Sequence, residues 1–104
     1  MSATKGWGFM AKAILNGVVV AESDNFELVE GNVYFPPDTV NMQYFSKTAL
    51  HTTCPWKGQA SYYTVTVDGM KVDNAAWYYV EPKPAAANIR NHVAFYAHKV
   101  KIER

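Results

Sequence analysis

The sequence has little cysteine, little net charge and no long hydrophobic run, and each shortage excludes a class of protein. Cys54 is the only cysteine among 104 residues, so the chain cannot form an internal disulfide. A four-ligand zinc site would need all three histidines to converge on that cysteine, so we expect no metal and no cofactor. Ten Lys and Arg against nine Asp and Glu give a net charge of +1, which argues against a nucleic-acid or membrane-surface partner.

Hydrophobic runs are short throughout the chain. No stretch approaches the roughly 18 apolar residues of a membrane span. The first residues, Met-Ser-Ala-Thr-Lys-Gly, show no apolar run followed by a cleavage site. We therefore expect a soluble, cytoplasmic protein, and the length of 104 residues predicts one domain over residues 1–104.

Turn-forming pairs between apolar segments are the clearest structural signal. Asn16-Gly17 and Asp68-Gly69 each separate two β-prone segments, and both pairs tolerate the positive φ angles of a type I′ turn. Glu30-Gly31-Asn32 interrupts a third such segment. These positions predict three β-hairpins.

The remaining segments also favour strands. Residues 93–102 alternate in polarity and predict one half-buried final strand. Single helical turns are predicted only at 37–42 and 84–89, where prolines and short polar residues suit a helix start. The rest is β-branched and aromatic, so we expect an all-β domain of roughly seven to nine short strands, in two packed sheets or a partly open barrel.

The segment around Cys54 is the first candidate site. Pro55 disfavours a helix before it and Gly58 lets the chain turn, so Cys54 is predicted to end a strand before a tight loop. Lys57 then lies close enough for its ammonium group to favour the thiolate or to meet an anionic ligand. The alternative is that Cys54 is a small buried hydrophobe and Lys57 a solvated turn charge.

Aromatic residues form the second candidate site. Alternation along a strand puts Trp77 and Tyr79 on one face and Tyr78 on the other, and it separates Tyr62 from Tyr63 in the same way. Aromatic walls with a few polar tips are typical of small-molecule pockets. The alternative is that these side chains only fill the core, as most aromatics do in small β proteins.

Other chemistry-bearing residues give weaker signals. His51 is three residues from Cys54, so in a regular strand the two point to opposite faces, and a thiol–imidazole pair would need a bulge there. His92 or His98 could approach only through the fold. The carboxylates show no paired spacing and are expected to be solvated turn and edge charges. They are Glu22, Asp24, Glu27, Glu30, Asp38 and Asp73.

Several motifs occur in an order that resembles a known family. They are Ala21-Glu22-Ser23, Tyr34-Phe35-Pro36, Cys54-Pro55-Trp56-Lys57-Gly58, Ala76-Trp77-Tyr78-Tyr79 and Val93-Ala94-Phe95-Tyr96. From about residue 11 to 102 the chain resembles the domain-of-unknown-function 427 family of small, mostly bacterial proteins. The resemblance implies a fold similar to the β-tent, in which two antiparallel sheets lean together, with one or two single-turn helices.

The resemblance implies little about activity. Some classifications give the family a nucleotidyltransferase-type label, but that chemistry normally uses paired carboxylates that hold metal ions, and the sequence shows no such pair. The family's cysteine-lysine motif and its Ala-Trp-x-Tyr motif map onto Cys54, Lys57, Trp77 and Tyr79. Family members often have an arginine where this chain has Pro37, so an anion contact made there has no counterpart here.

Three functions fit these patterns, and we favour the first. It is the binding of a small polar or anionic ligand in an aromatic cleft next to Cys54 and Lys57. The other lining residues would be Tyr34, Tyr62, Tyr63, Trp77 and Tyr79. The second is a thiol-dependent or nucleotidyltransferase-like enzyme with Cys54 as its nucleophile. The third is a homo-oligomeric interaction module, such as a homodimer, joined by exposed aromatic residues.

Overall fold

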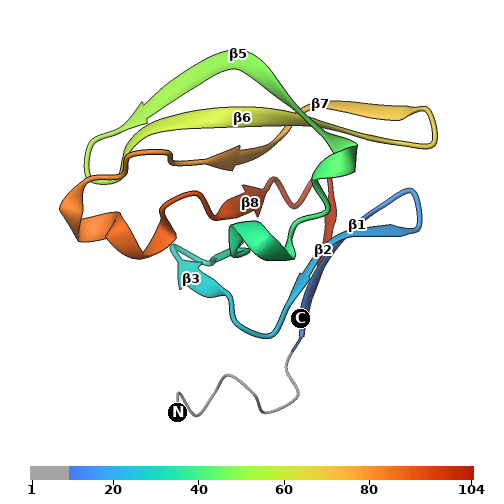
Figure 1. Cartoon of the computed structure of the whole chain (residues 1–104), viewed down its shortest axis with the longest axis horizontal. Coiled ribbons are helices and arrows are strands. Elements are labelled where there is room, and N and C mark those ends of the chain that lie inside the picture. Colours follow the sequence, from blue (N-terminus) through green and yellow to red (C-terminus); the bar gives the residue numbers. More distant parts are fainter. Residues whose placement is uncertain (1–9) are drawn as a thin grey trace.

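The computed structural model describes residues 10–104, which form antiparallel β-strands joined by tight turns (Figure 1). A sheet of three strands has the order β2-β1-β9, a second has four in the order β5-β6-β7-β8, and β3 pairs with β4. The strands are β1 (Ala11–Leu15), β2 (Val18–Ser23), β3 (Glu27–Val29), β4 (Asn32–Tyr34), β5 (Phe45–Cys54), β6 (Gly58–Val67), β7 (Met70–Tyr78), β8 (Val93–Phe95) and β9 (Lys101–Glu103). The expected all-β class is confirmed.

The three predicted hairpins are confirmed, with two-residue turns. Positive φ angles at Asn16 (52°) and Gly17 (77°) reverse the chain between β1 and β2, and Asp68 (48°) and Gly69 (84°) do so between β6 and β7. In the β3–β4 hairpin the turn residues are Glu30 (φ 55°) and Gly31 (φ 81°). Both positions of a type I′ turn need positive φ, which Asn, Asp and Gly adopt at low cost.

Short 3-10 helices connect the strands. They are η1 (Pro37–Thr39), η2 (Met42–Tyr44) and η3 (Pro84–Ile89). The turns predicted at 37–42 and 84–89 are therefore present, and η1 and η3 both begin at a proline, whose missing N–H costs nothing in a first turn. No helix among residues 10–104 is long and apolar enough to cross a membrane.

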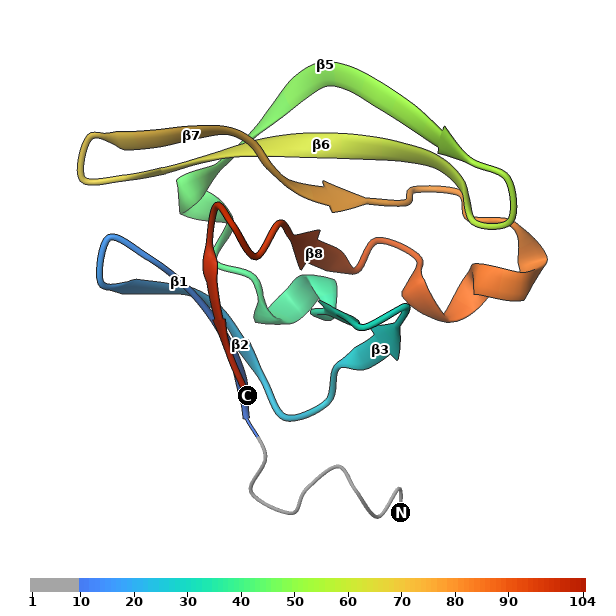
Figure 2. The ribbon, with the colours of Figure 1, turned by 180° about the vertical axis from the view of Figure 1, so that it is seen from behind.

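The β5–β8 sheet and the β2-β1-β9 sheet form two layers, seen from opposite sides in Figures 1 and 2. The larger hydrophobic cluster joins the two layers and includes Leu15, Val20, Val65 and Phe95. A smaller cluster lies on the other face of the β5–β8 sheet and includes Tyr34, Trp77, Ile89 and Ala94. Because Tyr62 belongs to the smaller cluster and Tyr63 to the larger, strand β6 is buried on both faces, as the alternation predicts.

The single final strand predicted over residues 93–102 is wrong. Val93–Phe95 pairs with β7, whereas Lys101–Glu103 pairs with β1 in the other sheet. Between them the carbonyl of Tyr96 accepts hydrogen bonds from the N–H groups of Lys99 and Val100, each at 2.9 Å, which turns the chain. The alternation misleads because the turn contains neither Gly nor Pro, and Val100 is buried in the core as a strand residue would be.

Candidate functional site

The loop between β5 and β6 is tight, as the sequence predicts. Cys54 ends β5 and pairs with Gly58, the first residue of β6. Gly58 has a φ of 113°, and a Cβ atom there would lie 3.5 Å from the Glu81 carbonyl oxygen and the Lys83 nitrogen. The Lys83 N–H donates to the Lys57 carbonyl (2.9 Å), and Lys83 Nζ donates to the Pro55 carbonyl (2.6 Å). The segment after β7 therefore fixes this loop in place.

Lys57 is buried at the end of this loop, with only 6% of its surface exposed. Its Nζ donates a hydrogen bond to Glu30 Oε1 and lies 5.5 Å from the centre of the Trp56 ring and 5.7 Å from that of Tyr79. Trp56 Nε1 donates to the other oxygen of the same carboxylate, Glu30 Oε2, at 3.2 Å. We call Cys54, Trp56, Lys57, Tyr79 and Glu30 the Lys57 site.

Glu30 is the residue of this site that sequence reasoning missed. It was expected to be a solvated turn charge, and its side chain is indeed half exposed, but its two carboxylate oxygens bind Lys57 and Trp56. Glu30 stands at the first turn position of the β3–β4 hairpin, which carries it to a lysine 27 residues away in sequence. The positive charge of Lys57 thus already has an internal partner.

Both members of this pair are ionised at neutral pH. Burial lowers the pKa of Lys57, but the hydrogen bond to Glu30 and the nearby Tyr34 side chain raise it, and the net pKa lies above the ordinary lysine value. The hydrogen bonds from Lys57 and then from Trp56 hold the pKa of Glu30 below its ordinary value of 4.5. Each group stabilises the charged form of the other.

The aromatic residues expected near Lys57 pack together in the smaller hydrophobic cluster, except for Tyr63. Tyr34 is fully buried, and its hydroxyl oxygen accepts a 3.1 Å hydrogen bond from Trp77 Nε1. The Tyr62 hydroxyl lies 2.8 Å from Thr52 Oγ1 and 3.4 Å from the hydroxyl of Tyr96. The hydrogen bond with Tyr62, followed by burial, raises the pKa of Tyr96 to about 12. Hydroxyl groups of Tyr34, Tyr62 and Tyr96 therefore hydrogen-bond within this aromatic cluster.

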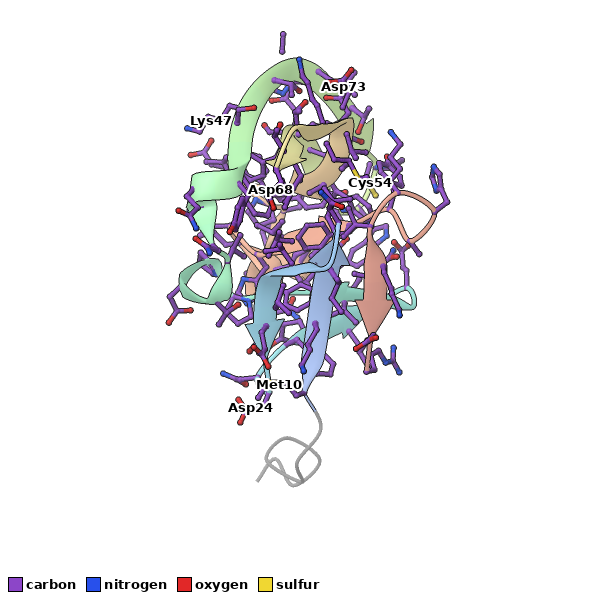
Figure 3. All side chains as sticks on the ribbon, turned by 90° about the vertical axis from the view of Figure 1, so that its right-hand side faces the viewer. Met10, Asp24, Lys47, Cys54, Asp68 and Asp73 are labelled. Atoms are coloured by element: carbon purple, nitrogen blue, oxygen red, sulfur yellow. The ribbon has the colours of Figure 1, made fainter. Side chains whose placement is uncertain are left out.

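Strand register decides which predicted residues share a face. Thr52 pairs with Ala60 and Cys54 with Gly58, so Cys54 faces the same side as Tyr62. Tyr79 is buried on that side, and this burial raises the pKa of its hydroxyl group. The charge of Lys57 lowers the same pKa and Cys54 raises it, so the three side chains lie close together. Tyr63 is the exception among the predicted residues, because it points to the opposite face. Figure 3 shows Cys54 and Lys47, which is the cross-strand partner of Tyr63, on opposite sides of the molecule.

The structure brings no histidine to Cys54 as its base. His51 Nδ1 lies 3.3 Å from Ser61 Oγ, on the face that carries Tyr63, as strand alternation predicts. His92 Nδ1 lies 2.9 Å from the Arg90 carbonyl oxygen, and the His98 ring lies 5.6 Å from that of Tyr96. Among residues 10–104, no three His, Cys, Asp or Glu side chains gather in a group that could hold a metal ion.

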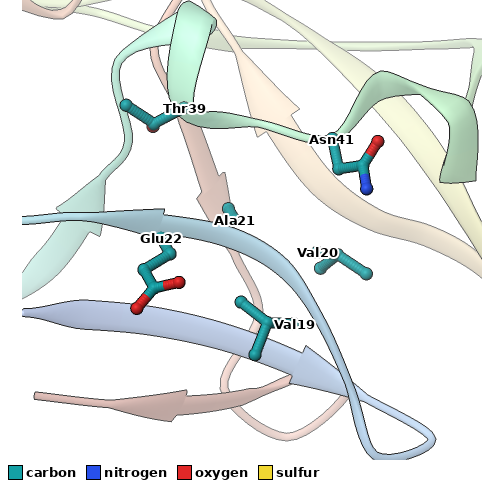
Figure 4. Close-up of a pocket in the computed structure, with 6 residues that line it drawn as sticks. All are labelled: Val19, Val20, Ala21, Glu22, Thr39 and Asn41. Atoms are coloured by element: carbon teal, nitrogen blue, oxygen red, sulfur yellow. The ribbon is translucent and has the colours of Figure 1, made fainter.

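Hollows occur elsewhere on the surface. A groove of about 350 Å³ lies over Tyr63 and Tyr78, on the face of the sheet opposite Cys54. A neighbouring hollow of about 320 Å³ is lined by Gln59, Ser61, Val80 and Glu81. A third, of about 320 Å³, is formed between β2 and η1 by backbone and small side chains, with Glu22 at its rim (Figure 4). Sequence reasoning did not identify these hollows, because residues from separate segments of the chain line each of them.

Comparison with known sequences gives one result. No curated protein sequence matches this chain. A family model described as "Domain of unknown function (DUF427)" matches residues 9–104. This match spans the strands, the β5–β6 loop and the aromatic residues described above, and it agrees with the resemblance carried by the Cys54–Gly58 and Ala76–Tyr79 motifs. The chain therefore belongs to the DUF427 family.

Proposed function

We propose that the protein binds a small ligand bearing a carboxylate or similar anionic group, and that this group contacts Lys57 in the position taken by Glu30. One observation carries the proposal: a buried ammonium group is closed off by a single carboxylate that reaches it from an exposed hairpin turn. A buried charge is expensive unless it is paired. An anionic ligand would keep it paired while Glu30 returns to water.

The surroundings of Lys57 suit such an exchange. Glu30 is half exposed, and its carboxylate gains hydration when it moves from Lys57 into solvent. The faces of Trp56 and Tyr79 flank the ammonium group and offer contact area for the apolar part of a ligand. Cys54, which is half-buried beside Tyr79, forms part of the same wall rather than a nucleophile activated by a histidine.

Titrating the 15N-labelled protein with acetate, benzoate and inorganic phosphate tests the proposal by NMR. We expect the amide signals of the β5–β6 loop and of the Glu30 turn to shift together. Glu30→Gln should bind the anions at least about fivefold more tightly, because it removes the internal competitor. Glu22→Gln is the matched control, because Glu22 also pairs with a lysine, Lys12 at 3.8 Å, but on the exposed surface.

Two results would contradict the proposal. One is that Glu30→Gln binds the anions no more tightly than the wild type. The other is that the bound anion leaves Cys54 as open to alkylation by iodoacetamide as before. The alkylation assay uses the unaltered protein, so it gives an answer even if the Glu30 variant folds poorly.

A further inference from the structure

A groove on the opposite face of the β5–β8 sheet has the features of a second binding site. It has a volume of about 350 Å³, and small-molecule pockets typically have about 300–1,000 Å³. Tyr63, Tyr78 and Val93 come from the sheet, while Met42 in η2 and Val80 after β7 form two of its edges. We call it the Tyr63 groove. It shares no lining residue with the Lys57 site.

The floor of the Tyr63 groove is a pair of stacked rings. The centres of the Tyr63 and Tyr78 rings are 4.2 Å apart, and their planes differ by 17°. Burial, together with the nearby and hydrogen-bonded Tyr78 side chain, raises the pKa of Tyr63 to about 12, so its hydroxyl is neutral at physiological pH. The groove therefore has an aromatic floor that carries hydroxyl groups.

The edges of the Tyr63 groove are apolar and uncovered. Met42 is 44% exposed and Val80 is 48% exposed, and both line the same groove. A ligand with an apolar body would cover both side chains and remove their surface from water. This contact would supply most of the affinity.

Lys47 supplies the charge at the groove. It pairs with Tyr63 across the β5–β6 ladder, so its side chain stands on the same face as the stacked rings. It is the only charged side chain among the described residues that line the groove. It is exposed, and no ion pair or hydrogen bond of its side chain occurs within residues 10–104. Its ammonium group can pair with a ligand without displacing another charge, whereas at Lys57 a ligand has to replace Glu30.

Because of the neighbouring hollow, the two ends of the groove differ in charge. Val80 lines both hollows, and the second one carries the carboxylate of Glu81. An anionic group is repelled at the Glu81 end and attracted at the Lys47 end. The charge pattern therefore favours a ligand with its negative group at Lys47 and its apolar body toward Val80.

We propose that the Tyr63 groove binds a small amphipathic carboxylate, with the carboxylate at Lys47 and the apolar body over Tyr63 and Tyr78, between Met42 and Val80. This site is separate from the Lys57 site and does not depend on it. The volume and the uncovered apolar edges suit a small ligand with an apolar body, and Lys47, which has no ion pair within residues 10–104, suits its carboxylate.

Three ligands of one length and different charge provide the test: hexanoate, hexan-1-ol and hexylammonium. Titrated into the 15N-labelled protein, hexanoate should shift the amide signals of Lys47, Tyr63, Val80 and Asn91, which all belong to the groove. It should bind about fivefold more tightly than hexan-1-ol, the size expected for one exposed ion pair. Hexylammonium should bind more weakly than the alcohol.

The Lys47→Gln variant isolates the charge. It should bind hexanoate and hexan-1-ol equally well, whereas Lys71→Gln, which alters an exposed lysine of β7 outside the groove, should keep the preference for hexanoate. Glu30→Gln should leave the signals of the groove and their titration unchanged, which separates this site from the Lys57 site.

Three results with hexanoate would overturn the proposal. Hexanoate could shift only the signals of the β5–β6 loop, it could bind no better than hexan-1-ol, or it could keep its preference in Lys47→Gln. Signals of the groove that move with protein concentration alone would also contradict it, because a second copy of the chain would then be covering Met42 and Val80.

Discussion

Each face of the β5–β8 sheet holds a lysine beside aromatic rings, and the two lysines differ in what their charge already contacts. Lys57 is 6% exposed, and its ammonium group is bound to Glu30. Lys47 is exposed and carries no ion pair within residues 10–104. A lysine close to aromatic residues in sequence can therefore already be paired within the protein, as Lys57 is with Glu30. At Lys57 a ligand must replace a carboxylate, whereas at Lys47 it only replaces water.

Removing Trp77 should have the largest effect, because it breaks the aromatic cluster on the Lys57 face. Trp77 is 9% exposed and packs against Tyr34 and Tyr96. Trp77→Ala should lower the free energy of unfolding by about 3–5 kcal/mol, as other buried tryptophans do. Urea unfolding measures it. Trp56→Ala is the control: this ring is 39% exposed, and its loss should cost less than about 1 kcal/mol.

Removing one tyrosine hydroxyl from each face of the β5–β8 sheet tests whether the two faces differ in their access to water. Tyr34→Phe leaves Trp77 Nε1 buried without an acceptor, which should cost about 1–3 kcal/mol of unfolding free energy. Tyr63→Phe removes a hydroxyl whose partner, Tyr78, lines the open groove, so water replaces it and the cost should stay below about 1 kcal/mol. Equal losses in urea unfolding would mean that the two faces are equally closed to water.

Changing the pH should alter the stability that Lys57 gains from Glu30, whereas Lys47 has no such contribution to lose. This is the smallest of the expected changes in stability. The pKa of Glu30 is lowered in the folded protein, so its contribution to stability is complete above pH 4.5 and is lost as the pH falls through the lowered pKa. The pH dependence due to Lys57 has the opposite sign. The pKa of Lys57 is raised, so its contribution to stability is complete below pH 10.5 and is lost as the pH rises through the raised pKa of the folded protein.

The pH experiment compares variants in urea. Glu30→Gln should unfold at a lower urea concentration than the wild type at pH 7, and the difference should shrink as the pH falls from 4.5 through the lowered pKa of Glu30. Lys47→Gln should match the wild type at both values. A constant difference between Glu30→Gln and the wild type would show that the Glu30 side chain stabilises the fold by packing rather than by charge.

The sequence predicts the local features of this fold well. Asn16-Gly17 and Asp68-Gly69 determine hairpins because few residues accept positive φ, and Pro55 with Gly58 correctly ends one strand and begins the next. Alternation correctly separates Tyr62 from Tyr63. It fails at Tyr96, where the chain leaves one sheet for the other while its side chains continue to alternate between core and solvent.

Features that depend on pairing between distant segments could not be predicted. Glu30 meets Lys57 only because the β3–β4 hairpin packs next to the β5–β6 loop, and Lys47 and Val80 line one groove only because β5 and the segment after β7 border the same face. Spacing in the sequence carries no information on either contact. The faces on which the candidate residues lie were thus largely predicted, while the partner of Lys57 and the groove over Tyr63 were not.

Strand β9 makes the architecture depend on contacts across nearly the whole chain. Lys12 pairs with Glu103, so the first strand that the structure describes has one of its two neighbours at the opposite end of the sequence. Closing so long a loop costs chain entropy before any contact repays it, so such pairings form slowly. During folding, β1 can pair early with β2, but its other edge must stay open until residues 101–103 arrive. That open edge is where we expect a folding intermediate to associate with another chain.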